Sequence, residues 1–421
     1  MTELEIPAFS KDLNGYALYW PSIDITMKCE RVSDDAKGEL VVIHDNGIGT
    51  KELLRTSVNL MSLPTMDKIA TRLLKNSKDI DWQAALQYCT KLVVSALREG
   101  GIQENINQEP KIMRIPLLID PIIPLNMPTT IFSAGGKGKS TIADYFAILV
   151  QFGICADGNL PFVPMQANVL YLDWEADADT HRRYITAIKR GLHIDNDEPI
   201  LYRQMSNPLI NSVEYVRSQV AQFDIGFIII DSVMAATATS GHGQSESTIA
   251  SEFYNCLNSF RCTSLSIDHI TKSDMSSNQA TAPFGSVSKF NRSRAQYELK
   301  SDEDDSDHKE YALVSKKFNP GRSRKPIGMA VDFYNDSDDT LQSIRFSACD
   351  IGSNNDLAER VLTKRQRIIN ILQSEGTAAI KDIAEMLNEP DNTKSIGVIL
   401  AKDKKTFVKI GTGKYGLLEN F

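Results

Sequence analysis

The sequence has few cysteines and no long apolar segment. Its six cysteines are scattered among 421 residues without a C-x-x-C pair, and no histidine lies nearby to complete a metal-ligand cluster. No run of about 18 apolar residues occurs, and the opening "MTELEIPAFSKDLNG" lacks the basic and apolar regions of a signal peptide. We therefore expect a cytoplasmic protein with no membrane association.

An excess of positive charge is also missing from the chain as a whole. There are 46 Lys and Arg against 54 Asp and Glu, a formal net charge of −8. A DNA-binding surface would therefore have to be local. With 42% hydrophobic and 24% charged residues, the chain is typical of a globular protein and long enough for two or three domains.

Composition and hydrophobic pattern divide the chain into five segments. Five of the 16 prolines fall between Glu109 and Thr129, which indicates a connector. Four β-rich runs then alternate with helical stretches, as in an α/β domain with a largely parallel sheet. The predicted segments are an α+β N-terminal accessory domain (1–105), a Pro-rich linker (106–126), the α/β domain (127–348), a second linker (349–359) and a winged helix-turn-helix domain (360–421).

Particular runs carry these assignments. In the first segment, Asp81 can cap a helix with an apolar stripe from Trp82 to Ala96. The α/β strands are "TTIF", "NVLYLD", "FIIID" and "SLSID", with "YALVSKKF" and "GMAVDF" added at one edge. After "DIGSNND", three amphipathic helices and a hairpin around a Gly-Thr-Gly turn predict the winged helix.

The strongest motif is "AGGKGKST", between an apolar strand and an amphipathic helix. Glycine-rich backbone can curl around phosphate so that several N–H groups point inward, and the helix N-terminus adds its positive dipole end. Lys139 would reach the β- and γ-phosphates, and the Ser140 hydroxyl would bind Mg²⁺. Ser133 stands where the motif G-x-x-x-x-G-K-[ST] has its first glycine. The predicted nucleotide-binding residues are Gly135, Gly136, Lys137, Gly138, Lys139, Ser140 and Thr141.

Polar side chains at three other strand ends are candidates for using the nucleotide. Asp231 ends the run "IGFIIID" and could hold Mg²⁺ together with Ser140. Glu175 follows "VLYLD" and could polarise the attacking water, with Asp173 as the competing candidate. His269 follows "SLSID" and could sense the γ-phosphate. The other five histidines, His181 among them, are given no role.

Taken in order, "AGGKGKST", "VLYLDWE", "FIIIDS", "SIDHITK" and "GSVSKFNRSRAQYEL" resemble the RecA-like P-loop ATPases of the RepA type, which are hexameric replicative-helicase ATPases of plasmids and phages. The resemblance covers roughly residues 115 to 335. It implies ATP and Mg²⁺ as cofactors, a catalytic base at Glu175, a phosphate sensor at His269 and a contribution of Lys139 to catalysis. It further implies a homo-oligomer, with a hexamer favoured, whose neighbouring subunit completes the site through Arg294, Lys316 or Lys317; a solvated basic edge is the equal alternative for these three.

DNA is the expected partner. From Arg360 to Phe421 there are 11 basic and 7 acidic residues, a local net charge of 11 − 7 = +4. Lys394 and Lys402 on the third helix could meet a major groove, and Lys409 and Lys414 on the wing could meet phosphate, although winged helices also dock proteins. Two polar loops, after Asp231 and after His269 and including Lys272, could grip single-stranded DNA inside a ring or could be plain surface loops.

Two functions fit these patterns. The first is an ATP-hydrolysing, DNA-dependent motor, such as a replicative helicase of a phage or mobile element. The alternative is a nucleotide-switched DNA-binding, loader or regulatory protein that hydrolyses ATP slowly and does not separate strands. Unwinding requires coupled hydrolysis and an oligomer, whereas a switch needs only a nucleotide-dependent affinity.

Overall fold

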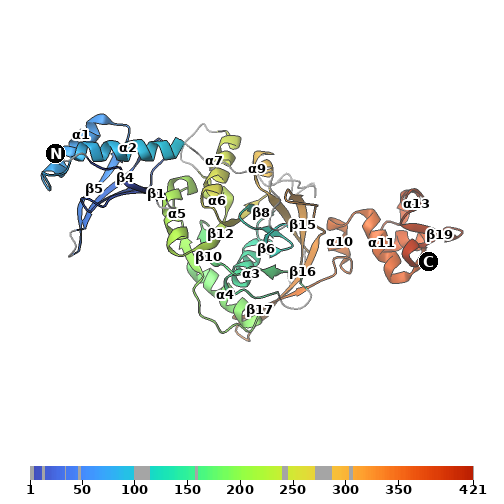
Figure 1. Ribbon diagram of the computed structural model, residues 1–421. Coiled ribbons are helices and arrows are strands. Elements are labelled where there is room, and N and C mark those ends of the chain that lie inside the picture. Colours follow the sequence, from blue (N-terminus) through green and yellow to red (C-terminus); the bar gives the residue numbers. More distant parts are fainter. Residues whose placement is uncertain are drawn as a thin grey trace. The chain divides into compact units, whose positions relative to one another are not determined.

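The computed structural model describes residues 4–11, 15–33, 35–45, 49–98, 114–156, 160–238, 245–270, 287–302 and 307–420. These form two compact units, Met1–Met113 with Ser212–Asp224, and Arg114–Asn211 with Ile225–Phe421. Figure 1 traces the elements along the chain. Within the described ranges, no helix is both long and apolar enough to cross a membrane.

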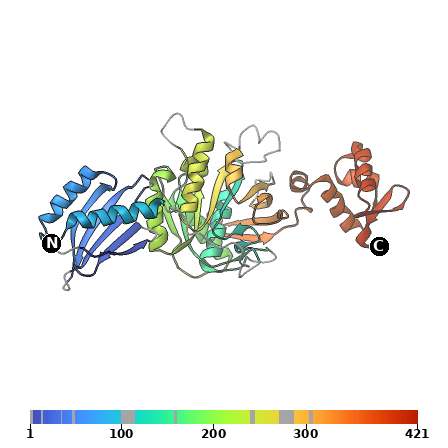
Figure 2. The same ribbon diagram turned by 45° about the horizontal axis from the view of Figure 1, so that its top comes forward.

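The first unit is built on an antiparallel sheet with α1 and α2 against one face (Figure 2). As the sequence predicts, Asp81 caps α2 by accepting a 3.0 Å hydrogen bond from the Ala84 N–H, and Trp82, Leu86 and Val93 of the stripe are buried. Contacts also group α5 with this unit. The strands are β1 (Ala8–Lys11), β2 (Gly15–Trp20), β3 (Ile25–Glu30), β4 (Lys37–Asp45) and β5 (Thr50–Asn59), and the helices are α1 (Leu63–Leu74), α2 (Trp82–Arg98) and α5 (Val213–Gln222).

The second unit contains a nine-stranded sheet in the order β11-β10-β12-β13-β8-β14-β15-β16-β17. The first six are parallel to one another, and the last three are joined by antiparallel pairs. This confirms the α/β core with its largely parallel sheet. The strands are β8 (Pro128–Ser133), β10 (Asn168–Asp173), β11 (Leu201–Gln204), β12 (Ile225–Asp231), β13 (Thr263–His269), β14 (Ala295–Ser301), β15 (His308–Phe318), β16 (Ile327–Asn335) and β17 (Leu341–Ala348).

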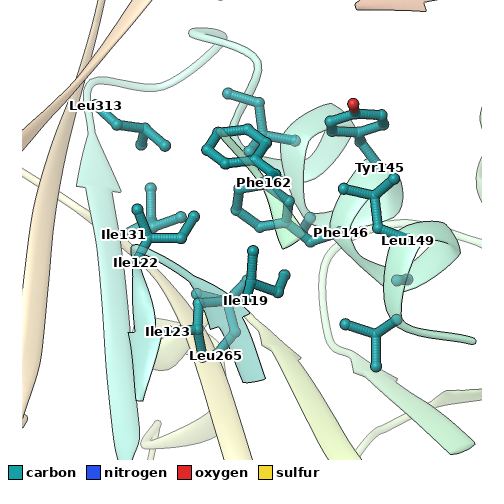
Figure 3. Packing of buried hydrophobic residues seen from close by; sticks show 14 of the residues in the cluster. Ile119, Ile122, Ile123, Ile131, Tyr145, Phe146, Leu149, Phe162, Leu265 and Leu313 are labelled. Atoms are coloured by element: carbon teal, nitrogen blue, oxygen red, sulfur yellow. The ribbon is translucent and has the colours of Figure 1, made fainter. Parts of the chain in front are cut away.

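Helix α3 (Lys139–Phe152) is the centre of the hydrophobic core. Eleven of its 14 residues are buried, which is typical of a helix that is apolar around its whole circumference. Phe146 packs edge-on against Phe162 at 5.3 Å between ring centroids, as seen among the core side chains of Figure 3. On another side, Tyr145 stacks on Phe346 of β17 at 3.8 Å. The antiparallel end of the sheet therefore packs against the same helix as the parallel strands.

The remaining helices of this core connect the parallel strands. Helix α4 follows β10 and packs against β17 as well as α3. These helices are α4 (Ala178–Gly191), η1 (Leu209–Ser212), α6 (Val233–Ala236), α7 (Glu246–Ser259) and α9 (Val287–Arg292).

The prediction of a linker at residues 106–126 is wrong for residues 114–126, the part that the structure describes. Residues 117–124 form β6 (Leu117–Asp120) and β7 (Ile123–Pro124), which join β9 (Val163–Pro164) in a small sheet. Ile119 and Ile123 are fully buried in the core. The apolar residues between the prolines supply enough buried surface to form strands, and the prolines occupy strand ends or turns, where no ladder hydrogen bond is required.

The second predicted linker, 349–359, also differs from expectation. It contains the start of α10 (Asn355–Val361), which Asn354 caps by accepting a 3.1 Å hydrogen bond from the Leu357 N–H. Leu357 is fully buried against Ala312 of β15. Ile351 and Leu357 thus attach this segment to β15 through a small apolar cluster.

The C-terminal segment has a small core of its own, formed by Ile368, Ile383, Ile396 and Leu400 with neighbouring apolar side chains. The three predicted helices and the hairpin are present, and the sequence missed a short strand that pairs with the hairpin. These elements are α11 (Lys364–Glu375), β18 (Thr377–Ala379), α12 (Ile380–Met386), η2 (Pro390–Asn392), α13 (Thr393–Lys402), β19 (Phe407–Gly411), β20 (Lys414–Leu417) and η3 (Leu418–Asn420).

Candidate functional site

A cavity of about 360 Å³ lies where the parallel strands end. Its lining includes residues 136–141 of the glycine-rich loop together with Glu175, Asp231 and His269. Strand register brings these together: Asp173 pairs with Asp231 across β10 and β12, and His269 pairs with Ser133 across β13 and β8. Because β13 separates β8 from β12, His269 stands between the loop and the two acids.

The glycine-rich loop has the backbone conformation that its sequence predicts. Gly136 and Gly138 have φ of 70° and 75°, in the left-handed region that favours glycine. A Cβ on Gly138 would lie only 2.5 Å from the Tyr311 hydroxyl oxygen. Helix α3 begins at Lys139, so its N-terminal N–H groups and dipole face the cavity. This loop can hold an anion such as a phosphate group.

Lys139 is buried at 5% exposure and directed back over the loop. Its Nζ donates hydrogen bonds to the Ala134 carbonyl at 2.8 Å and to the Ser133 carbonyl and hydroxyl at 3.3 and 3.2 Å. Burial lowers the pKa of this ammonium, and the charges of Asp231 and Glu175 partly offset that effect. Ser133, the departure from the usual motif, thus supplies two of the acceptors for the loop lysine.

Asp231 and Ser140 form a second contact in the cavity. The Ser140 hydroxyl donates to Asp231 Oδ2 at 2.6 Å, and the buried Tyr171 hydroxyl donates to the same oxygen at 3.2 Å. Burial raises the pKa of Asp231, because the charged carboxylate is disfavoured away from water. A hydroxyl and a carboxylate at this separation are oxygen ligands suited to Mg²⁺.

Glu175 and Asp173 occupy different environments although they are two residues apart. The Glu175 carboxylate faces the cavity, accepts a hydrogen bond from the Ser232 hydroxyl and lies 3.5 Å from His269 Nε2. The His269 contact, opposed by burial and reinforced by Ser232, lowers the pKa of Glu175. Asp173 is fully buried, and its Oδ1 accepts the Glu175 N–H at 2.9 Å. Only Glu175 is therefore placed to act on a bound molecule.

His269 joins the catalytic candidates to one another. Its Nδ1 lies 3.5 Å from Lys139 Nζ, and its Nε2 faces Glu175. His269 therefore contacts both Lys139 and Glu175, the cation and the acid that would lie on either side of a terminal phosphate. The geometry brings together Lys139, Glu175, Asp231 and His269, as the sequence patterns suggested.

The basic residues suggested as a contribution from a neighbouring subunit do not line this cavity. Arg294 is exposed, Lys316 forms a 2.7 Å ion pair with Glu298, and Lys317 donates to the Asn291 carbonyl at 2.8 Å. Burial and the charge of Arg294 lower the pKa of Lys317. Lys272 and most of its loop lie outside the described residues.

Sequence reasoning missed two groups of residues at the site. His181, in the first turn of α4, lines the cavity and contacts two buried carboxylates. Tyr311 and Phe333 enter from the antiparallel strands β15 and β16. A histidine in the helix that begins three residues after Glu175 was a usable signal. Tyr311 and Phe333 could be identified only from the tertiary structure, because they lie on strands far along the chain from the loop.

Part of the chain is similar to a known protein family. Residues 103–275 match a family model described as an AAA domain. No curated protein matches the chain. Among solved structures, a KaiC-like protein from the hyperthermophilic archaeon Pyrococcus horikoshii OT3 aligns at 14% identity and a TM-score of 0.37, covering 54% of this chain and 93% of that one. The glycine-rich loop and Lys139 lie within the residues that are similar to AAA domains, and this agrees with a P-loop ATPase core in this part of the chain.

Proposed function

We propose that the protein is an ATP-hydrolysing, DNA-dependent motor of the RepA helicase type that acts as a ring. The observation that carries the ATPase step is the convergence of Lys139, Glu175, Asp231 and His269 on one cavity with a glycine-rich loop. The DNA-dependent and helicase parts of the proposal rest on the C-terminal lysines and on the motif resemblance.

ATP is the substrate and Mg²⁺ the metal that this donor set fits. The Ser140 Oγ and the Asp231 Oδ2, which lie 2.6 Å apart, would hold the ion. The N–H groups of the loop, together with Lys139, would hold the phosphates. When bound, Mg²⁺ neutralises phosphate charge. The aromatic side of the cavity, with Tyr184 and Phe333, offers apolar surface for the rest of the nucleotide.

Glu175 is the residue that would orient and polarise the attacking water. A glutamate whose pKa is not raised is ionised at neutral pH, so the Glu175 carboxylate can accept a hydrogen bond from the attacking water and orient it. His269 would then sense the terminal phosphate. Its ring contacts both Lys139 and Glu175, so a phosphate bound between Lys139 and Glu175 would change the position or hydrogen bonds of the His269 ring.

The lysines of the C-terminal segment support a nucleic-acid partner. Three of its basic residues are bound internally: Lys364 and Arg367 pair with Glu389, and Arg365 pairs with Asp403. Seven others are exposed, and no ion pair is seen for them among the described residues: Lys381, Lys394, Lys402, Lys404, Lys405, Lys409 and Lys414. Four of these lie on the third helix and the hairpin, as a winged helix that contacts phosphate would need.

The ring is a separate part of the proposal. Arg294 and Lys317 lie outside the cavity of their own chain, as residues that serve a neighbouring site would. A mixing experiment tests whether subunits share a site. Glu175→Gln protein and Arg294→Ala protein should each be inactive alone. When the two proteins are combined, partial ATPase activity should return, because some subunit interfaces then contain both an intact Glu175 and an intact Arg294. No recovery from two inactive pools would contradict sharing through Arg294.

The first experiment is steady-state ATP hydrolysis by the purified chain with and without single-stranded DNA. Glu175→Gln should lower kcat by about 10²-fold or more, as loss of a general base does, and Lys139→Ala should abolish nucleotide binding. Asp179→Asn is the matched control, since Asp179 is an exposed carboxylate at the start of α4 that pairs with Arg182. DNA stimulation lost in both site variants supports the motor. Slow turnover that ignores DNA would instead indicate a nucleotide-controlled switch.

A further inference from the structure

His181 is a buried histidine between two buried carboxylates at the edge of the cavity. Its Nδ1 lies 2.8 Å from Asp144 Oδ1. Its Nε2 lies 3.3 Å from Asp173 Oδ2, an ion-pair distance without the alignment of a hydrogen bond. His181, Asp144 and Asp173 are 4%, 2% and 0% exposed, so water contributes little to solvating their charges.

The surroundings favour the doubly protonated ring. A neutral imidazole would turn one lone pair toward a carboxylate oxygen, since it carries a single N–H. Burial lowers the pKa of His181, but the contacts with Asp144 and Asp173 outweigh it and raise the pKa to about 10. His181 is therefore a cation at neutral pH that compensates two acids.

The two acids belong to the two elements that carry the catalytic candidates. Asp144 lies on α3, five residues after Lys139 of the glycine-rich loop. Asp173 ends β10, and its carboxylate accepts the backbone N–H groups of Glu175 at 2.9 Å and Ala176 at 3.2 Å. Asp173 thus closes the turn that presents Glu175 to the cavity.

We propose that His181 is a positioning residue for ATP hydrolysis, which ties the phosphate-loop helix to the Asp173 turn and so holds Glu175 at its distance from the bound phosphates. This inference rests on the proposed ATPase function. Without the cation, Asp144 and Asp173 would face each other uncompensated beside Asp231, and relief of that repulsion would loosen the turn. Glu175 would keep its contacts with Ser232 and His269 but lose its fixed backbone.

Further contacts tie the same network to the metal-binding carboxylate. The Tyr171 ring lies 4.5 Å from the His181 ring, centroid to centroid, and its hydroxyl donates to Asp231 Oδ2 at 3.2 Å. The Tyr202 hydroxyl donates to Asp173 Oδ2 at 2.9 Å. His181 thus packs against Tyr171, which donates to Asp231, and contacts Asp173, to which Tyr202 donates. Asp173 and Asp231 end the neighbouring strands β10 and β12.

The test is His181→Asn in the full-length chain, which keeps one N–H donor near Asp144 and removes both the charge and the contact with Asp173. A displacement of about 1 Å in a reacting group costs about 10²-fold in rate, so kcat for ATP should fall by about 10- to 100-fold. KM and the Kd of a non-hydrolysable ATP analogue should change by less than about threefold. His193→Asn is the matched control, because His193 is exposed and its φ of 56° suits asparagine.

A double-mutant cycle shows whether His181 acts through Glu175. Glu175→Asp shortens the acid by one carbon and should itself reduce kcat, and adding His181→Asn should then cause a much smaller loss than in the wild type. Losses that multiply would overturn the proposal. A large rise in analogue Kd with unchanged kcat would also overturn it and would assign His181 to phosphate binding.

Two further outcomes are separable. If His181→Asn does not bind the analogue at all, Tyr202→Phe provides the second variant, since it removes one donor to Asp173 without altering a charge. It should lower kcat in the same direction by a few-fold, and an unchanged kcat would reject the positioning role. If Glu175→Gln is as active as the wild type, the proposed function itself fails; if Glu175→Gln is inactive and His181→Asn fully active, only this inference fails.

Discussion

Three glycines of the phosphate loop should respond to alanine in a graded order. Gly135 has no positive φ and nothing within 4 Å of an added Cβ, Gly136 has φ of 70° in open space, and Gly138 combines φ of 75° with a Cβ position 2.5 Å from the Tyr311 hydroxyl oxygen. Alanine therefore meets no obstacle at the first position, backbone strain at the second, and strain with steric overlap at the third.

The magnitudes follow from these contacts. A left-handed backbone costs a non-glycine residue about 1–2 kcal/mol, and overpacking costs about 1–3 kcal/mol. Tyr311 is only 3% exposed, so its ring has little room to move away. Relative to Gly135→Ala, we expect the stability of the loop and α3 to fall by about 1–2 kcal/mol in Gly136→Ala and by about 2–5 kcal/mol in Gly138→Ala. Comparison between variants cancels the entropy that alanine removes from the unfolded chain.

Hydrogen–deuterium exchange of peptides from α3, in the nucleotide-free protein, measures the loss of stability at the loop and this helix. The method gives the opening free energy of α3 alone, without unfolding the other unit. A Tyr311→Ala background is the control, since it removes the overlapping ring and should bring Gly138→Ala to the level of Gly136→Ala. Equal effects of the two substitutions in the wild-type background would refute the packing of Tyr311 on the loop.

Three other expectations concern the core, the buried ion pairs and the C-terminal segment. Phe146→Ala, which removes a fully buried ring from α3, should destabilise the ATPase unit by about 3–5 kcal/mol in denaturant unfolding. Because the folded pKa of His181 is raised from 6.5 to about 10, its stabilisation is complete below pH 6.5 and is lost as pH rises to 10; His181→Asn should flatten that decline in unfolding free energy. Lys394→Ala with Lys409→Ala should weaken duplex DNA binding and reduce the slope of log K against log salt by about 2 in fluorescence anisotropy titrations.

Each of these has a result that contradicts it. A Phe146→Ala loss below about 1 kcal/mol would mean that α3 is not the packed centre of the unit. An unchanged pH slope in His181→Asn would mean that the imidazolium is not held by its acids. For DNA, Lys68→Ala with Lys91→Ala, two exposed lysines of the first unit, is the matched control, and an equal effect on the salt slope would argue against a specific C-terminal surface.

The residues of the phosphate-binding site were predictable because their chemistry is local. A strand, a glycine-rich turn and a helix in succession require the φ values seen at Gly136 and Gly138, and an apolar strand that ends in an acid places Asp231 at the edge of a parallel sheet. The alternation of β-rich and helical runs likewise determined the α/β core. The C-terminal helices and hairpin followed from their periodicity and from the Gly-Thr-Gly turn.

Tertiary structure alone decided which side chains meet. His181 and Asp144 are 37 positions apart, and their 2.8 Å contact depends on the packing of α4 against α3. Tyr311 lies against the loop because the antiparallel strands pack against α3. The described parts of the two predicted linkers form regular elements because Ile119, Ile123 and Leu357 are buried. Local sequence rules determine backbone conformation within an element, whereas strand register and helix packing, which depend on all elements at once, determine the distances on which the chemistry depends.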